Sequence, residues 1–421
     1  MQASGYKQMK INYHQAGTNA RSLLEEELNL RISSPSSLHW NYTVNGHPVF
    51  VNLVAELTAE IEKIWRTEFQ IQKLWNLLPG VARNHYLHSL LISEIQSTNE
   101  IEGIHSTRNE IEDAIRAAES KDSANLSFRP FQEMAKTYLL LFGELDNERV
   151  RFPATLKEMR ELYDQLMGKE IAADDKLDGL YFRKGTVSIT DGTKEIHRGL
   201  SGEDAIHSGV LTMLNAQQDS EHVLVNAFVG HFLLEHIHPF YDGNGRFGRF
   251  LLGLKLTEYL SAPTAISLSA AVLHQKARYY KAFSIAEEKL NRGELTFFVH
   301  DLAEILASAM LDLLESLTEK VSQLEQLSKG IDRYKSNRDS NGASLQDREG
   351  EILFLLGQVR LFGPRSGMTN DELSAVTGLS KKVLRPRTLK LREAGLIREV
   401  EKRPLVFALT DEAIELLGIS D

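Results

Sequence analysis

Residues 238–249 read HPFYDGNGRFGR and place a base, an acid, a Gly-Asn-Gly turn and two cations within twelve positions. Pro239 cannot lie inside a helix, so the apolar helix before it must end near His238. Apolar residues resume with helical spacing after Gly245, so the turn is expected at a helix N-terminus. Unpaired backbone N–H groups and the positive end of the helix dipole meet there, and together they attract an anion.

Arg246 and Arg249 lie three positions apart, so both project from one side of the first helical turn. Asp242 can hold a hard divalent cation beside bound phosphates, and His238 can act as a general base. These residue types indicate a nucleotide-phosphate site. The pattern is not a Walker A loop, since no Lys-Ser/Thr pair follows the glycines, and it is not a dinucleotide-binding turn, since a helix rather than a strand precedes it.

Two other interpretations stay open on the residues alone. The Gly-Asn-Gly turn can simply connect two helices. A metal centre built from His231, His236 and His238 is the other alternative, although these residues lack the HExxH spacing and Pro239 disturbs the helix face that they would share.

The stretch resembles the signature of the Fic family, H-P-F-x-D/E-G-N-G-R-x-x-R, with every fixed position present. The resemblance extends over roughly residues 40–320. It implies a protein adenylyltransferase, which moves AMP from ATP to a Ser, Thr or Tyr hydroxyl of a target protein or of itself, with Mg²⁺. Because His238 and Asp242 are intact, AMP transfer is favoured over other transfers.

The resemblance also implies a role for each part of the site, mainly positioning and charge neutralisation around an in-line displacement of pyrophosphate. The implied residues are His238 as the base, Asp242 for Mg²⁺, Gly243, Asn244 and Gly245 as the anion cradle, Arg246 and Arg249 for the β- and γ-phosphates, and Tyr280 for the adenosine.

A second carboxylate lies far upstream, where Thr98, Glu102 and Gly103 stand at the end of a helical pattern. By residue type alone this is a helix that ends at a glycine, with Glu102 in solvent. The segment also resembles the family's inhibitory helix, whose glutamate pairs with the second signature arginine, here Arg249, and misplaces ATP. In some relatives this glutamate supports AMP removal, so a net de-AMPylase is an alternative function.

The elements around these residues predict a mostly α fold, a Fic-type helical core with a β-hairpin flap. Helical spacing begins at Leu53, and Asn45-Gly46 marks an early hairpin. Residues 183–199 alternate and predict a second hairpin. It can merely cover the core, but the resemblance implies a flap that pairs with an extended stretch of the target, with Val187 and Ile196 as clamps.

The C-terminal part predicts a winged helix-turn-helix, because it reads helix, helix, helix and strand-turn-strand. Its basic segment, residues 380–404, indicates DNA binding; a solvated face or a protein-docking module is the alternative. Pro386 predicts that the basic helix begins there. A nucleotide-sensing transcriptional regulator is therefore the main alternative to an enzyme. The basic residues of this helix are Lys381, Lys382, Arg385, Arg387, Lys390 and Arg392.

Composition sets the wider limits. The 421 residues carry a net charge of -10 and no cysteine, which excludes disulfides and cysteine zinc sites. No run approaches the ~20 apolar residues of a membrane span and no secretory signal is visible, so a cytoplasmic protein is expected.

A homodimer through the long helix at 295–328 is a further expectation. The predicted divisions are an N-terminal region 1–120, a catalytic core 121–328, a linker 329–348 and the winged helix 349–421.

Overall fold

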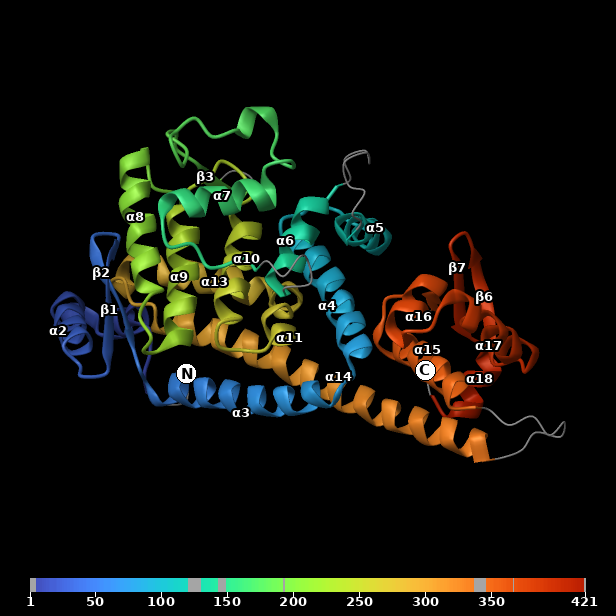
Figure 1. Ribbon diagram of the computed structural model, residues 1–421. Coiled ribbons are helices and arrows are strands. Elements are labelled where there is room, and N and C mark those ends of the chain that lie inside the picture. Colours follow the sequence, from blue (N-terminus) through green and yellow to red (C-terminus); the bar gives the residue numbers. More distant parts are fainter. Residues whose placement is uncertain are drawn as a thin grey trace. The chain divides into compact units, whose positions relative to one another are not determined.

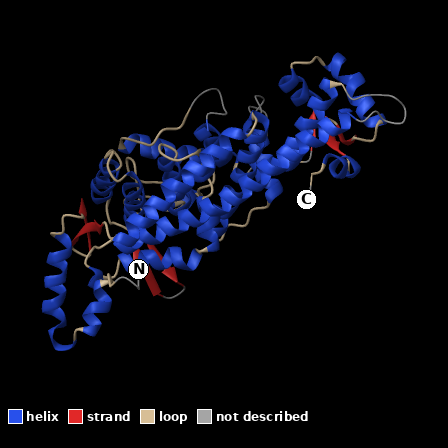
Figure 2. Ribbon diagram, turned by 90° about the horizontal axis from the view of Figure 1, so that it is seen from below, coloured by secondary structure: helices blue, strands red, loops and turns tan. Residues whose placement is uncertain are grey.

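The computed structural model describes residues 5–119, 130–142, 149–191, 194–336, 346–365 and 367–419. The chain divides into two compact units, Met1–Glu68 with Leu91–Leu311 and Phe69–Leu90 with Asp312–Asp421. Helices predominate, as predicted, and the described strands form small antiparallel sheets (Figure 2). In the described residues no helix is both long enough and apolar enough to cross a bilayer.

The first unit opens with two helices that the sequence did not reveal, α1 (Met9–Gln15) and α2 (Ala20–Ile32). In α2 the apolar and polar residues are only weakly separated into two helix faces, and Met9, Leu24 and Leu28 pack against Phe50. Next come β1 (Ser37–Val44) and β2 (His47–Asn52), which form the predicted hairpin. Asn45 and Gly46 both have positive φ, as a tight two-residue hairpin turn requires.

Helices then lead up to the core. Their bounds are α3 (Ala55–Leu77), α4 (Gly80–Ile101), α5 (Arg108–Glu119), α6 (Gln132–Phe142) and α7 (Leu156–Met167). Gly103 has a φ of 74°, which ends α4 where the sequence predicted. Thr107 and Glu110 form the predicted capping box at the start of α5.

The centre of the first unit consists of α8 (Glu203–Ala216), α9 (Val223–Ile237) and α10 (Asn244–Leu256), which lie side by side (Figure 1). Twelve of the fifteen residues of α9 are buried, because this helix is apolar on all sides. It ends immediately before His238, as Pro239 predicted.

Short elements complete the first unit. These are the 3-10 helix Ala173–Asp175, β3 (Ser188–Asp191), β4 (Lys194–Arg198), α11 (Ala262–Ala265), α12 (Leu268–His274), α13 (Lys276–Ala286) and the 3-10 helix Lys289–Asn291. The strands β3 and β4 form the predicted second hairpin, whose turn at residues 192–193 lies outside the described residues.

The second unit contains the C-terminal part of α14 (Thr296–Ser336), which continues eight residues into the predicted linker. Apolar residues such as Ile331 remain buried there, so the helical pattern extends further than the polar composition suggested. The elements after it are α15 (Asp347–Phe362), β5 (Gly367–Thr369), α16 (Asn370–Thr377), α17 (Lys381–Glu393), β6 (Ile397–Lys402), β7 (Leu405–Leu409) and α18 (Asp411–Leu417).

The prediction that the basic helix begins at Pro386 is wrong. Helix α17 begins at Lys381, and Pro386 lies inside it. Proline removes one helical hydrogen bond, but Pro386 is exposed, so water can satisfy the carbonyl that loses its partner. The sheet order is β5-β7-β6, with β7 in the middle.

Candidate nucleotide-phosphate site

The loop before α10 is held by its own asparagine. The Asn244 side chain accepts a hydrogen bond from the Phe240 N–H at 3.0 Å and donates one to the Phe240 carbonyl at 2.9 Å. Gly243 has a φ of 75°, and a methyl group there would lie 2.9 Å from Met167 Cε. The Asn244 side chain therefore shapes the loop. Its part in an anion cradle stays a prediction and concerns the backbone N–H groups of the first turn of α10.

Arg183 is a residue that the sequence did not single out. Its side chain is fully buried, and it donates to the carbonyls of His238 at 2.8 Å and Ile237 at 3.3 Å, and to that of Gly185. Its backbone N–H donates to the Pro239 carbonyl at 3.2 Å. Arg183 therefore ties the segment before the hairpin to the loop that carries His238.

His238 caps α9 in the left-handed region, at φ 52° and ψ 63°. Its Nδ1 lies 3.3 Å from the carbonyl oxygen of Glu235. A carbonyl can only accept, so Nδ1 carries the proton and the lone pair is on Nε2. Burial lowers the pKa of His238 to about 4, and the neighbouring His197 adds to this effect. The imidazole is therefore neutral near pH 7, as a general base must be.

Arg249 is enclosed by the end of α4. Its Nε donates to Thr98 Oγ1 at 2.9 Å, and its Nη2 donates to the Thr98 carbonyl at 3.0 Å and to Glu102 Oε1 at 2.8 Å. Burial lowers the pKa of Arg249, but the Glu102 carboxylate together with Tyr279 and Glu235 outweighs this effect, and the pKa rises. A methyl group on Gly245 would lie 2.2 Å from Glu102 Oε1, so this carboxylate lies against the first turn of α10.

Arg246 has a different partner. Its Nη1 donates to Glu170 Oε2 at 2.8 Å, and its Nη2 lies 3.7 Å from Asp242 Oδ2. The two signature arginines thus lie in the same turn of α10 but pair with separate carboxylates. Glu170 was not predicted, because it lies outside any motif and 76 positions from its partner.

Asp242 is suited to hold a divalent cation. Its side chain is 51% exposed, and its Oδ1 accepts the Gly243 N–H at 2.6 Å. Mg²⁺ is commonly held by one or two carboxylates together with phosphate oxygens and water. A single exposed carboxylate beside a helix N-terminus fits that arrangement, and Asp242 is the residue that would hold the ion.

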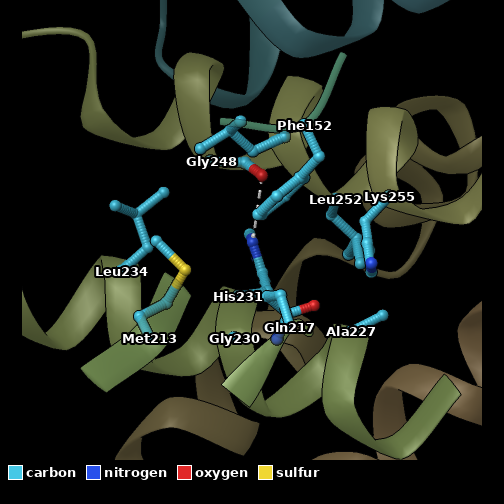
Figure 3. A pocket seen from close by; sticks show the side chains of 11 residues that line it. Phe152, Met213, Gln217, Ala227, Gly230, His231, Leu234, Gly248, Leu252 and Lys255 are labelled. Carbon is cyan, nitrogen blue, oxygen red and sulfur yellow. Dashed lines mark hydrogen bonds between the residues drawn. The ribbon is translucent and has the colours of Figure 1, made fainter. Parts of the chain in front are cut away.

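The alternative metal centre is not supported, because the three histidine rings have different partners. His231 lies 3.2 Å from the Gly248 carbonyl and 2.8 Å from the Tyr279 hydroxyl, while His236 lies 2.9 Å from the Tyr42 hydroxyl. Figure 3 shows His231 pointing to Gly248 beside a cavity of about 10 Å³. That volume holds one water at most. Through its two ring nitrogens, His231 on α9 contacts Gly248 on α10 and Tyr279 on α13, so it ties three helices together.

The remaining predicted residues lie on α13 and on the hairpin. Tyr280 is 44% exposed, and its pKa is raised to about 12, by burial and then by Glu102. Val187 is half-buried, and its carbonyl accepts the Gly199 N–H at 3.1 Å at the base of the hairpin. Ile196 lies on β4, but its side chain falls outside the described residues.

Residues 153–256 match the model of the Fic/DOC family. The chain carries a Fic/DOC domain. Two curated relatives are the protein adenylyltransferase Fic of Drosophila mojavensis, 30% identical over 151 residues, and that of Drosophila grimshawi, 29% identical over 151 residues. Each match covers 36% of this chain, and the matches span 27% and 28% of the two relatives.

The fold around the Fic/DOC domain also has a counterpart among solved structures. The crystal structure of a Fic family protein from Desulfovibrio desulfuricans G20 aligns with a TM-score of 0.50 and 18% identity. The alignment covers 86% of this chain and 97% of that one. At this identity the likeness concerns the fold alone.

Proposed function

We propose that this chain is a protein adenylyltransferase that transfers AMP from ATP to a Ser, Thr or Tyr hydroxyl. The observation that carries the proposal is a half-buried His238, with its Nδ1 turned to the Glu235 carbonyl, in the loop that leads to a helix N-terminus bearing Arg246 and Arg249. A base, an anion-binding terminus and two cations are the parts that phosphoryl chemistry needs. The relatives named protein adenylyltransferase support AMP as the group transferred.

In the proposed reaction, His238 Nε2 takes the proton of the target hydroxyl. The hydroxyl oxygen then bonds to the α-phosphorus of ATP, while the bond to the bridging oxygen breaks and pyrophosphate leaves. Arg246, Arg249 and the N–H groups of α10 stabilise the charge on the phosphates. Mg²⁺, when bound at Asp242, supplies further neutralisation of that charge.

We also propose that Glu102 inhibits transfer. Its carboxylate pairs with Arg249, whose side chain is 1% exposed, and lies against Gly245. A phosphate that approaches the same cation must compete with a negative charge that is already in place. The pair joins residues 147 positions apart, so it depends on the docking of α4.

The test is transfer of label from ATP labelled at the α-phosphorus. We expect no labelling of protein by His238→Ala and more labelling by Glu102→Gly than by the wild type. The double variant is the control, because labelling that survives the loss of His238 cannot come from this mechanism. Labelling unaffected by His238→Ala would contradict the proposal, and a Glu102→Gly variant no more active than wild type would contradict inhibition.

The same assay separates the alternatives. A net de-AMPylase would release AMP from a pre-labelled target, and a nucleotide sensor would bind ATP without transferring label. We infer that the β3–β4 hairpin holds the target, because an extended peptide can add a third strand at the edge of a two-stranded sheet. Self-association through α14 and a cytoplasmic location stay predictions.

DNA binding by the C-terminal elements is a second candidate function, favoured by the distribution of charge. Residues 380–404 contain nine Lys and Arg against three Glu, in a chain whose net charge is -10. They include α17 and β6, and β7 follows directly after them. Together with α15 and α16 before them, this is the element order of a winged helix. The exposed cations of this face include Lys382, Arg385, Lys402 and Arg403.

We test this with the full chain and a fluorescent duplex of mixed sequence, measuring anisotropy over a range of salt concentrations. Lys382→Ala/Arg385→Ala should weaken binding and reduce the slope of log affinity against log salt by about 1–2. Lys157→Ala/Lys329→Ala removes the same charge from exposed helix positions elsewhere and is the control. An equal loss of DNA affinity in both double variants would contradict DNA binding by this face. Binding of a protein instead of DNA would identify a docking module.

A further inference from the structure

Both cations of the signature are already paired with carboxylates in this structure. Glu102 Oε1 lies 2.8 Å from Arg249 Nη2, and Glu170 Oε2 lies 2.8 Å from Arg246 Nη1. The Arg246 and Glu170 side chains are only 3% and 13% exposed. A charge pair this well shielded from water is stronger than a surface pair, so a phosphate cannot use Arg246 without competing with Glu170.

Glu170 is held in place by the helix before it. The Tyr163 hydroxyl donates to the Asp242 carbonyl at 2.9 Å, and Met167 packs against Gly243. The Glu170 N–H then donates to the Met167 carbonyl at 2.8 Å in the turn after α7. Tyr163, Met167 and Glu170 are spaced four and three positions apart, so one face of α7 and its following turn meets the signature loop.

The pair is also incomplete. A guanidinium and a carboxylate can form two parallel hydrogen bonds, but here one bond is made. Arg246 Nε is buried and has no hydrogen-bond partner among the described residues. Buried polar atoms without partners are costly. A phosphate has more acceptor oxygens and more charge than this carboxylate, so it is the better partner for the unused donor.

We propose that Glu170 is a second built-in competitor for nucleotide phosphate, acting on Arg246 as Glu102 acts on Arg249. The inference rests on the proposed use of both arginines for phosphate. A polyphosphate must then displace two carboxylates, and removal of Glu102 alone leaves the site half blocked. This makes Glu170 a determinant of nucleotide affinity that lies outside the signature and outside the α4 segment.

The probe is inorganic pyrophosphate, titrated calorimetrically into the full chain with Mg²⁺, which requires no transfer activity. Glu170→Gln keeps the shape of the side chain and removes its charge. We expect it to bind pyrophosphate about tenfold more tightly than wild type, since each charge-assisted hydrogen bond that no longer competes is worth about a tenfold change. Glu102→Gln should give a similar gain, and the double variant should bind more tightly than either single variant.

Glu133→Gln is the matched control, because Glu133 pairs with Lys169, the residue next to Glu170, without touching Arg246. It should change affinity little. Weaker or unchanged binding by Glu170→Gln would overturn the inference. A carboxylate that only orients Arg246 for phosphate would, when removed, weaken binding instead of strengthening it. If Glu102→Gln still binds more tightly, the proposed function survives that result. Failure of every variant to bind pyrophosphate would contradict both the role of Glu170 and the proposed function.

Discussion

His238 illustrates how surroundings select one form of a side chain. Its left-handed backbone brings Nδ1 to the Glu235 carbonyl, which leaves the lone pair on Nε2. Burial lowers its pKa to about 4, and His197 and Arg183 contribute in the same direction. The histidine is therefore deprotonated by its position before any substrate arrives.

This predicts a specific pH dependence. We expect the Cε1 proton of His238 to titrate near pH 4 in NMR spectra, assigned by its loss in His238→Ala, instead of near the ordinary 6.5. The folded pKa is depressed, so the unfolded chain binds the proton more readily. The stability that comes from the neutral ring is complete above pH 6.5 and is lost as the pH falls towards 4. A midpoint near 6.5 would contradict this account.

At the scale of elements, the base of the β3–β4 hairpin and the end of α9 form one assembly. The Leu200 N–H, after the hairpin, donates to the Ile237 carbonyl at 3.1 Å. Arg183, before the hairpin, donates to the same carbonyl. His197 lies 3.1 Å from the His236 carbonyl. The hairpin is therefore anchored next to His238. In the proposed reaction, a target strand would have to lie there for its hydroxyl to reach the His238 imidazole.

Gly199 tests this assembly. A methyl group there would lie 2.5 Å from Arg183 Nη2 and 2.8 Å from His238 Cβ. We expect Gly199→Ala to lower the free energy of unfolding by about 1–3 kcal/mol and to reduce label transfer. Gly80→Ala is the control, since no atom lies within 4 Å of the added methyl group, and its effect should stay within about 0.5 kcal/mol. Equal effects of the two changes would contradict the anchoring.

At the scale of the whole molecule, α14 belongs to both units, with the division after Leu311. In the second unit its buried Leu327 packs against α15, where a methyl group on Gly357 would lie 2.3 Å from Leu327 Cδ2. The Tyr86 hydroxyl donates to Ser316 at 2.8 Å, and the Ala82 N–H donates to Gln358 at 3.2 Å. The C-terminal elements thus share a core with residues 69–90.

Leu327→Ala should therefore destabilise the second unit by about 2–4 kcal/mol, the range for a large core truncation. Urea unfolding can be followed by the fluorescence of Trp75, which lies in this unit, after Trp40 and Trp65 are replaced by Phe. Leu389→Ala is the control, because that side chain lies in the same unit and is 50% exposed. A loss no larger than that of the control would show that α14 and α15 do not share a core.

Much of the architecture could be predicted from the sequence. Pro239, Gly103 and Asn45-Gly46 restrict the backbone locally, and the structure confirms the helix ends and the hairpin turn expected from them. Pro386 misled, because an exposed proline is tolerated inside α17. The two N-terminal helices were missed, because the apolar residues of α2 are only weakly gathered on one face and the periodic signal is weak.

The sequence by itself determined the side-chain types of the signature loop and where its backbone turns, because backbone restrictions and side-chain types are local properties. The Glu102–Arg249 pair was expected only through the resemblance to a family. Tertiary structure decided that Asn244 shapes the loop, that Arg183 holds the His238 backbone and that Glu170 pairs with Arg246. These contacts join distant segments through packing, which periodicity along the chain does not encode.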